Sequence, residues 1–325
     1  MFKTRLTEMM GTRYPIIQGA LGGGLSRAEL VASVSNAGGL GMITSLNHAT
    51  ADELRNEIRK TQSLTDKPFG VNVTLLPTMR PVNYEEYFST ALEEGVRIIE
   101  TSGRSPEPYM KLLKDGGAVV MHKIGGTKHA RAAERVGVDA VSVVSFESAG
   151  HPLPDDVASS VLIPACVDAV NIPVVAAGGI ADARGFVSAL SLGAEGVLMG
   201  TRFTISKECM LHEKAKQWLL ELGEADTMLV HKAIKNTERV VRTEFAQQVL
   251  QLEESGAPLE EILAMISGDR VRDAYNSGEI SNALFTVGQV VGLCRDIPSV
   301  KDIIDGIISE AGTIIKRLQG MDAGS

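Results

Sequence analysis

The sequence is poor in aromatic residues, which make up 4% of its 325 residues. Nucleic-acid platforms rely on such rings for stacking, and aromatic-rich sandwiches rely on them for packing, so the composition favours neither class. Glycine, in contrast, is abundant, with 33 residues. Many glycines and few aromatic rings are typical of an α/β protein with tight turns between strands and helices.

The chain also lacks an excess of positive charge. Its formal net charge is -8 and its sequence pI is near 5.4. This balance disfavours a surface for polyanions, while a local basic pocket for a single phosphate stays compatible with it. We therefore expect a small-molecule substrate and no nucleic-acid partner.

Cysteine is scarce as well. Cys166, Cys209 and Cys294 are far apart, form no CxxC or Cys/His pattern and are odd in number, so they are interpreted as free thiols in a reducing compartment. No uncharged apolar run reaches the roughly 18 residues needed to span a bilayer, and the N-terminal segment lacks the order of a signal peptide. A cytoplasmic protein with no membrane partner is predicted.

The most informative stretch, residues 173–203, has the sequence PVVAAGGIADARGFVSALSLGAEGVLMGTRF. Apolar β-branched runs near both ends predict strands that are buried on both faces. Between them, Asp182 is a good N-cap for a helix whose apolar positions recur at helical spacing. The stretch therefore predicts one unit of two parallel strands joined by a helix.

The same alternation recurs from the N-terminus onward. Eight strands are predicted, and they begin near Pro15, Leu40, Phe69, Arg97, Ala118, Ala140, Pro173 and Gly196. Eight strands that are each followed by a helix are typical of a closed (β/α)8 TIM barrel, so the fold class is α/β.

After Phe203 the strand signal ends, and the pattern predicts only helices. We therefore expect a barrel over residues 1–209 and a helical addition over residues 210–325 that packs on it. This addition is a candidate lid or dimer contact, and a homodimer is one expected assembly. Its apolar stretch NALFTVGQVVGLCRD is interpreted as helix core, with a substrate wall as the alternative.

Glycines follow the last two strands of the predicted barrel. Gly178 and Gly179 come after the seventh strand, and Gly200 and Thr201 come after the eighth. Glycine lets backbone N–H groups approach an anion closely, and the loops after strands 7 and 8 are the usual phosphate site of such barrels. A phosphate site is predicted here, with ordinary turn glycines as the alternative.

The first strand leads into another glycine-rich turn, GALGGGL. No acidic residue ends the next strand, so this turn is not a dinucleotide fingerprint. Gly22 to Gly24 are either a flexible connection or a backbone surface against which a flat ring can lie. Ser26 and Glu29, three residues apart, predict a capping box for the helix that follows.

Three polar residues mark other strand ends. Asn72 lies in the apolar run FGVNVTLL, so its amide is either paired in the core or a ligand contact. Lys123 directly follows the fifth strand and is the best-placed cation for a phosphate or an electron-rich ring. His151 lies in the loop after the sixth strand, with Glu147 nearby, and imidazole suits proton transfer near neutral pH. The other histidines show no metal-like spacing with it, so no metal site is predicted.

Seven ordered motifs resemble one known family. They are PIIQGAL, NAGGLGMI, PFGVNVTLLPT, VVMHK, GVDAVSVVSFESAGHP, PVVAAGGIADARG and GAEGVLMGTRF. Together they resemble the nitronate monooxygenase, or 2-nitropropane dioxygenase-like, family of FMN-dependent TIM-barrel enzymes. Within it, the FESAGHP loop and the proline-containing loop LLPTMRPVNY look most like the NAD(P)H:quinone reductase branch. The GALGGGLS loop and Met79, where a polar residue is expected, depart from that branch.

The resemblance implies FMN as cofactor and NADH or NADPH as co-substrate. His151 matches the catalytic base of the nitronate-oxidising members, whereas in a quinone reductase the hydride passes from nicotinamide to flavin and this histidine only orients or polarises the substrate. Carried over motif by motif, the FMN contacts fall on Ala20, Leu21, Gly22, Asn72, Lys123, Ala149, Gly178, Gly179, Gly200 and Thr201.

The favoured function is therefore an FMN-dependent NAD(P)H:quinone oxidoreductase. One alternative is a nitronate monooxygenase that oxidises alkyl nitronates with O2 and uses His151 as base. Further alternatives are a flavin-dependent enoyl reductase and a non-catalytic flavin-binding protein, because a fold by itself does not fix an activity. The electron acceptor and the choice between NADH and NADPH stay open.

Overall fold

The computed structural model describes residues 2–75, 82–152, 155–233 and 236–322. Eight parallel strands form one sheet in the order β1-β8-β7-β6-β5-β4-β3-β2. Their bounds are β1 Ile16–Gln18, β2 Gly41–Thr44, β3 Phe69–Leu75, β4 Ile98–Gly103, β5 Val119–Ile124, β6 Ala140–Val144, β7 Val174–Ala177 and β8 Gly196–Met199.

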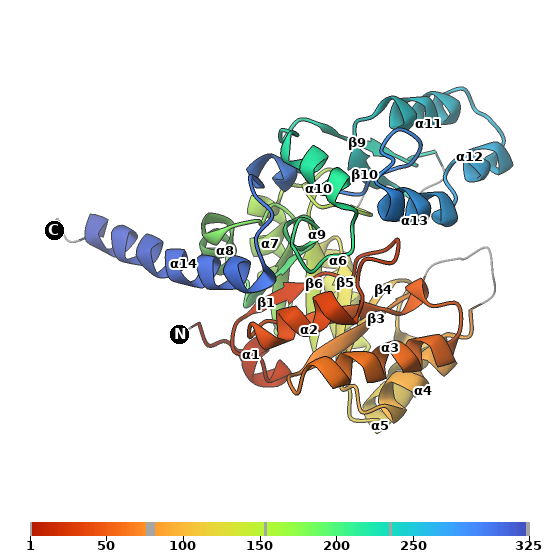
Figure 1. Cartoon of the computed structure of the whole chain (residues 1–325). Helices are drawn as coiled ribbons and strands as arrows, with labels where there is room; N and C mark the ends of the chain where they lie inside the picture. The colour runs from red at the N-terminus through yellow and green to blue at the C-terminus, as the bar shows by residue number, and fades with distance from the viewer. Residues whose placement is uncertain (1, 76–81, 153–154, 234–235, 323–325) are drawn as a thin grey trace.

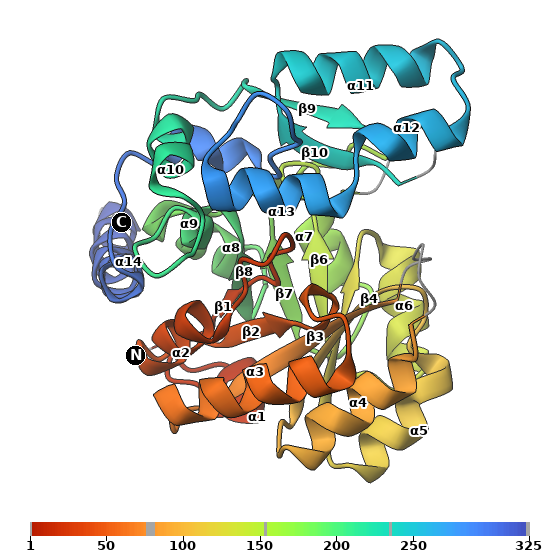
Figure 2. The ribbon, with the colours of Figure 1, turned by 45° about the vertical axis from the view of Figure 1, so that its right-hand side comes forward.

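The sheet closes on itself between β1 and β2. The N–H of Gln18 donates to the carbonyl oxygen of Leu40, and the N–H of Leu40 donates to the carbonyl oxygen of Ile16, both at 2.9 Å. These bonds pair the two end strands of the sheet order, so no edge is left open there. The predicted (β/α)8 barrel is confirmed, and Figure 2 shows its strands surrounded by helices.

Helices cover the barrel, and all of them except α1 follow a strand in the sequence (Figure 1). They are α1 Arg5–Met10, α2 Ala28–Asn36, α3 Ala51–Leu64, α4 Tyr84–Glu93, α5 Glu107–Asp115, α6 Thr127–Arg135, α7 Ser159–Val167, α8 Ala183–Ser191 and α9 Thr201–Thr204. The side chain of Asp182 accepts hydrogen bonds from the N–H groups of Arg184 and Gly185, which confirms it as the N-cap of α8.

The predicted capping box of α2 is wrong. The N-cap of this helix is Arg27, which makes no side-chain cap. The Ser26 hydroxyl instead accepts hydrogen bonds from the N–H of Leu21 at 2.7 Å and from Gln18 Nε2 at 2.9 Å. The buried Gln18 amide and the tight first loop compete successfully for this hydroxyl, so Ser26 organises the loop and not the helix end.

The sequence pattern predicts only helices after residue 209, but the structure also has two strands in this region. Strands β9 Thr227–Val230 and β10 Glu238–Val241 form an antiparallel pair. Each strand has only four residues, too few for a period-2 pattern to stand out between helical segments. The helices here are α10 Glu213–Leu220, α11 Glu244–Glu254, α12 Leu259–Met265, α13 Gly268–Ser277 and α14 Val300–Asp322.

The stretch NALFTVGQVVGLCRD is also not an α-helix. It is irregular up to the short 3-10 helix η2, Gln289–Leu293. The N–H of Gly288 donates to Thr201 Oγ1 at 2.9 Å, and the N–H of Gln289 donates to the Glu147 carbonyl oxygen at 3.1 Å. A Cβ on Gly288 would lie 2.7 Å from that same oxygen, so glycine permits this close contact with the barrel loops.

The last helix, α14, returns to the barrel and packs beside α8 and α2 (Figure 1). Its buried residues Val300, Ile304 and Ile307 belong to the same apolar cluster as Phe186 of α8. The three cysteines are free, as predicted, and all three are buried. Within the described part of the chain, no helix is both long and apolar enough to cross a membrane.

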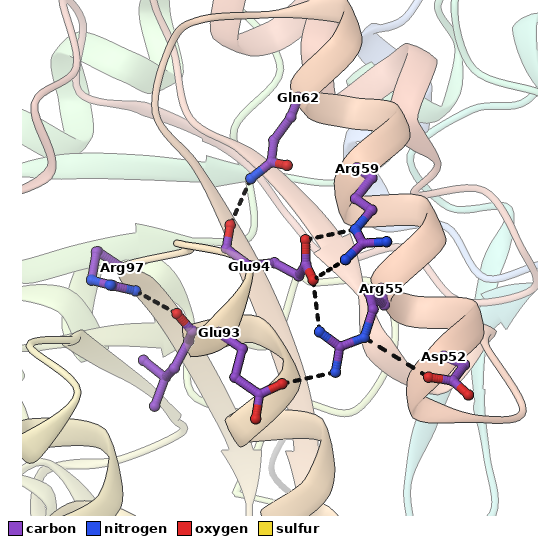
Figure 3. A network of polar contacts seen from close by, with 8 residues as sticks. Asp52, Arg55, Arg59, Gln62, Glu93, Glu94 and Arg97 are labelled. Atoms are coloured by element: carbon purple, nitrogen blue, oxygen red, sulfur yellow. Dashed lines mark hydrogen bonds and ion pairs between the residues drawn. The ribbon is translucent and has the colours of Figure 1, made fainter.

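Helices α3 and α4 are joined by a network of charges (Figure 3). Arg55 and Arg59 both bind the carboxylate of Glu94, at 2.6 Å and 2.9 Å. Arg55 also binds Glu93 at 2.8 Å, and Gln62 Nε2 donates to the Glu94 carbonyl oxygen at 2.6 Å. Hydrogen bonds from Arg59 and then Arg55 lower the pKa of Glu94 from its ordinary 4.5 to about 2.

We predict that Glu94→Gln destabilises the protein at neutral pH and that this difference disappears in acid. The folded-state pKa lies below the ordinary value, so the stabilisation is fully present above pH 4.5 and is lost as the pH falls toward about 2. Urea unfolding of both proteins across this range measures it. Glu85→Gln, on the same helix, is the control, and a Glu94→Gln effect that stays constant with pH would contradict the prediction.

Candidate active site

A cavity of about 1130 Å³ opens at the carboxyl ends of the barrel strands and is bounded on its other side by the C-terminal region. Barrel enzymes of this kind carry their active sites at that end. All the residues predicted for the site line this one cavity: Ala20, Leu21, Gly22, Asn72, Lys123, Ala149, His151, Gly178, Gly179, Gly200 and Thr201. The fold therefore brings them together, while their individual roles stay predictions.

A buried carboxylate lies beneath the cavity. Glu100 of β4 has no solvent exposure, accepts hydrogen bonds from Asn72 Nδ2 at 2.7 Å and Ser142 Oγ at 3.2 Å, and lies 3.3 Å from Lys123 Nζ. An ionised carboxylate is costly to bury unless it is paired and hydrogen-bonded. Here the compensating groups come from the two adjacent strands, β3 and β5, and from β6, the strand beyond β5.

Asn72 and Lys123 connect this carboxylate to the cavity. Lys123 lies within β5, which continues to Ile124, and does not follow the strand as predicted. Its side chain is 23% exposed, and its ammonium group has donors left over after its contact with Glu100. Asn72 Oδ1 accepts a hydrogen bond from Thr74 Oγ1 at 3.0 Å. The Asn72 amide is thus paired in the core and also lines the cavity, while its contact with a ligand stays a prediction.

Glu100 is not among the site residues that the sequence predicts. Asn72 is identified as a polar residue inside an apolar run. Glu100 shows the same signal, because it directly follows Ile98 and Ile99. A charged side chain in such a run needs partners, and those partners are distant in sequence. The pattern alone therefore marks the position as unusual but cannot name Asn72, Ser142 and Lys123 as its contacts.

The loop after β7 has a backbone that only glycine adopts readily. Gly178 has φ of 100° and Gly179 has φ of 72°, both in the left-handed region. A Cβ on Gly178 would collide with the hydroxyl groups of Ser145 and Ser148, which both donate hydrogen bonds to the Ala177 carbonyl oxygen. The loop after β6 thus packs closely against the loop after β7 and fixes its backbone conformation.

Four backbone donors at these loops have no partner. Among the residues that the structure describes, the N–H groups of Gly178, Gly179, Gly200 and Thr201 find no hydrogen-bond acceptor. Unpaired N–H groups at the end of a partly buried loop are costly unless water or a ligand satisfies them. All four residues line the cavity, so an anion with several oxygens could satisfy them together.

The loop after β1 is fixed by hydrogen bonds to Asn47 and by packing against Tyr275. Asn47 Nδ2 donates to the Leu21 carbonyl oxygen at 3.1 Å, and Asn47 Oδ1 accepts from the N–H of Gly24 at 3.2 Å. Gly23 has φ of 64°, and a Cβ there would lie 2.6 Å from the ring of Tyr275 on α13. Gly23 therefore allows close packing under the C-terminal region, and this part of the loop is not merely a flexible connection.

His151 lies exposed in the loop after β6, and its Nδ1 is 3.0 Å from the carbonyl oxygen of Thr237. A carbonyl can only accept, so Nδ1 carries the hydrogen and Nε2 of the neutral ring is left to accept a proton. The N–H of Arg239 also donates to the Gly150 carbonyl oxygen at 2.7 Å. The segment that enters β10 thus fixes the orientation of this histidine.

Glu147 is close to His151 in sequence, but its carboxylate is used elsewhere. It accepts hydrogen bonds from the N–H of Ser159 at 3.1 Å and from the Ser159 hydroxyl at 2.8 Å. Burial alone would raise the pKa of Glu147, but hydrogen bonds to its carboxylate, those from Ser159 among them, outweigh it and lower this pKa. Glu147 therefore anchors the β6 loop to α7 and is not a partner of the imidazole.

Some sequence predictions at this face cannot be placed. The proline-containing loop LLPTMRPVNY includes residues 76–81, and these, with Met79 among them, lie outside the described residues. No group of three or more His, Cys, Asp or Glu side chains in the described part of the chain could hold a metal ion. The wall opposite the strand ends includes Leu284, Thr286 and Val290 from the irregular stretch, so that stretch does line the cavity.

We predict that Glu100→Gln destabilises the protein by about 3 kcal/mol, because it leaves the largely buried Lys123 ammonium without its counter-charge. Adding Lys123→Met should recover part of this loss, and the double-mutant cycle in urea unfolding measures the coupling between the two charges. The exposed pair Lys111 and Asp115, one turn apart on α5, is the control, with an expected coupling below about 1 kcal/mol. Equal coupling in the two pairs would contradict the prediction.

Comparison with known proteins identifies the family. Residues 3–310 match the nitronate monooxygenase family. A curated relative from Rhodococcus jostii, (3aS,4S,5R,7aS)-5-hydroxy-7a-methyl-1-oxo-octahydro-1H-indene-4-carboxyl-CoA dehydrogenase, is 35% identical over 99% of this chain and 98% of its own length. A probable nitronate monooxygenase from Staphylococcus saprophyticus is 30% identical over 97% of this chain and 99% of its own length.

A solved structure supports the same assignment. FabK from Thermotoga maritima is 34% identical and superimposes with a TM-score of 0.92, covering 99% of this chain and 100% of that one. The family match covers nearly the whole chain, and the relatives match it from end to end. The chain therefore belongs to the nitronate monooxygenase family of oxidoreductases.

Proposed function

We propose that this chain binds FMN in the cavity and transfers a hydride from NADH or NADPH, through the flavin, to the double bond of an α,β-unsaturated acyl thioester. The observation that supports FMN is the set of unpaired N–H groups at Gly178, Gly179, Gly200 and Thr201. The observation that supports a thioester is the 35% identity, over the full length, to a dehydrogenase whose substrate is a CoA ester.

The residues present fit FMN, the cofactor of this family. The four N–H groups suit the oxygens of one terminal phosphate, and the dinucleotide fingerprint expected for FAD or NAD is missing from the sequence. Thr44 Oγ1 lines the cavity and is buried without a partner among the described residues, so a polar ring atom could satisfy it. Lys123 and Asn72 would offer further N–H donors to the ring.

When bound, FMN supplies the two-electron hydride chemistry. The chain's own residues then bind and orient the reactants. The loops after β7 and β8 would hold the phosphate, and the Glu100 carboxylate, which binds Lys123 and Asn72, would position these two side chains for the ring. The wall that includes Leu284 and Val290 excludes water from the reacting atoms. His151 orients a carbonyl or accepts a proton through Nε2.

The quinone acceptor predicted from the sequence is the second candidate. It is supported by the FESAGHP loop, while the other supporting segment, LLPTMRPVNY, is only partly described. Oxidation of a nitronate is supported by the 30% identity to a probable nitronate monooxygenase. A homodimer stays a prediction.

One experiment separates these acceptors. The purified protein is titrated with NADH and NADPH under argon, and bleaching of the flavin reports hydride transfer. The reduced protein is then mixed with crotonoyl-CoA, with a benzoquinone, or with neither. We expect rapid reoxidation by crotonoyl-CoA. Reoxidation by the quinone alone would favour the second candidate, and turnover of propionate 3-nitronate with O2 and no nicotinamide would favour nitronate oxidation.

We predict that Gly179→Val gives a folded but largely colourless protein. A side chain at this φ of 72° would distort the loop whose N–H groups are to meet the phosphate. FMN content is measured from the absorbance of the released pigment. Gly95→Val is the matched control, because Gly95 has a similar φ of 83° with no neighbour within 4 Å of an added Cβ. Full FMN occupancy in Gly179→Val, or equal loss in the control, would place the phosphate elsewhere.

We predict that His151→Ala changes flavin reduction by NADH less than about tenfold, since hydride transfer depends mainly on the placement of nicotinamide over the flavin. Loss of a general base for nitronate oxidation would instead cost about 10² to 10⁴-fold. Anaerobic stopped-flow measures the first rate, and oxygen uptake with propionate 3-nitronate measures the second. A thousandfold slower reduction with FMN still bound would rule out this minor role in reduction.

A further inference from the structure

His231 is an unusual residue of the cavity wall. It lies directly after β9, is only 3% exposed, and has φ of 64°, in the left-handed region. Among the described residues, neither of its ring nitrogens has a hydrogen-bond partner. Strained backbone and an unpaired buried polar group both cost stability, and they tend to occur together at functional sites. Because His231 lines the cavity, its ligand can come from there.

Two carboxylates lie on either side of this imidazole. Glu238 Oε2 is 3.5 Å from Nδ1, and Glu253 Oε1 is 3.9 Å from Nε2. Glu253 is fixed because it also accepts the backbone N–H of His231, at 2.8 Å and 2.9 Å. Glu238 is fixed by the Thr286 hydroxyl, which donates to Oε1 at 2.6 Å. A positive charge on the ring would thus be compensated from both sides.

Glu238 favours its charged form. Burial alone would raise the pKa of Glu238, but the nearby His231, the electrostatic influence of His151 and the hydrogen bond from the Thr286 hydroxyl outweigh it and lower this pKa. The groups facing His231 are therefore two acidic side chains, with a second histidine near one of them. Glu238 and Thr286 also line the cavity, so this arrangement opens toward the substrate.

We propose that His231, supported by Glu238, is the group that exchanges a proton with the α-carbon of the thioester. This proposal rests on the proposed function. With FMN bound as the hydride donor, the β-carbon would receive a hydride with its electron pair. The former π electrons form a new bond from the α-carbon to the proton that leaves a His231 nitrogen. NADH or NADPH replaces the hydride, and water replaces the proton.

His231 suits this step better than His151 does. His151 is exposed to solvent, and one of its nitrogens already binds the Thr237 carbonyl oxygen. His231 is shielded from water, and among the described residues neither of its nitrogens makes a hydrogen bond, although a carboxylate oxygen lies 3.5 Å from one and 3.9 Å from the other. A proton donor in a water-poor site, with a carboxylate to stabilise its charged form, matches the requirements of general acid catalysis.

His231→Asn is the decisive variant, since asparagine tolerates a positive φ and hydrogen-bonds but does not exchange protons. His129→Asn, an exposed histidine on α6 at the same cavity, is the matched control. Anaerobic stopped-flow measures flavin reduction by NADH and reoxidation of the reduced protein by crotonoyl-CoA. The dissociation constant of crotonoyl-CoA for the oxidised protein is measured from the flavin spectrum.

We expect His231→Asn to slow reoxidation by about 10² to 10⁴-fold. Flavin reduction and crotonoyl-CoA binding should change by less than about threefold, because they involve no proton at the α-carbon. Glu238→Gln should slow the same step more weakly, which keeps the test valid if His231→Asn folds poorly. In D2O, the product should carry deuterium at the α-carbon.

Unchanged reoxidation in His231→Asn or in Glu238→Gln would overturn the proposal. So would an equal loss in His129→Asn, or a loss in His231→Asn that affects both half-reactions and binding alike, since that pattern indicates a structural role. The proposed function fails in a different way. In that case the wild-type protein, once reduced by NADH, is not reoxidised by crotonoyl-CoA at all.

Discussion

The closure of the barrel between β1 and β2 is the constraint on which the site depends. Two backbone hydrogen bonds, Gln18 to Leu40 and Leu40 to Ile16, turn a row of parallel strands into a ring. Closure brings the carboxyl ends of all eight strands to one mouth. Residues as distant in sequence as Ala20 and Thr201 therefore line the same cavity. An open sheet of the same strands would spread them along an edge.

The C-terminal region completes the cavity because it is tied to the barrel loops at short range. The N–H of Gly288 binds the Thr201 hydroxyl after β8, and the N–H of Gln289 binds the Glu147 carbonyl after β6. The segment entering β10 holds His151 through the Thr237 carbonyl oxygen. A change in any of these contacts would alter both the loops below and the wall above. Such coupling is expected where polar backbone groups are paired across a cavity.

Carboxylates lie behind opposite sides of this cavity and have different surroundings. Glu100, beneath the strand ends, is paired with an ammonium group and two neutral donors, and this arrangement fixes the polar groups that face the cavity. Glu238 and Glu253, in the C-terminal region, flank an imidazole that has no hydrogen-bond partner in the described structure. At Glu100 the carboxylate has its counter-charge and its hydrogen bonds, which suits a binding role. At His231 the imidazole has carboxylates nearby but no hydrogen bond, which suits proton exchange.

The sequence by itself determined the features that depend on neighbours along the chain. These are the eight strand-and-helix units, the Asp182 cap, and the glycines after β7, whose positive φ angles local sequence can demand. Only the tertiary structure decided what depends on distant partners. Ser26 accepts a hydrogen bond from Gln18 and does not cap a helix, and the short strands β9 and β10 pair with each other. Glu100 is surrounded by donors from three other strands, and His231 lies between two glutamates. Periodicity and propensity report local preferences, whereas these contacts depend on which surfaces packing brings together.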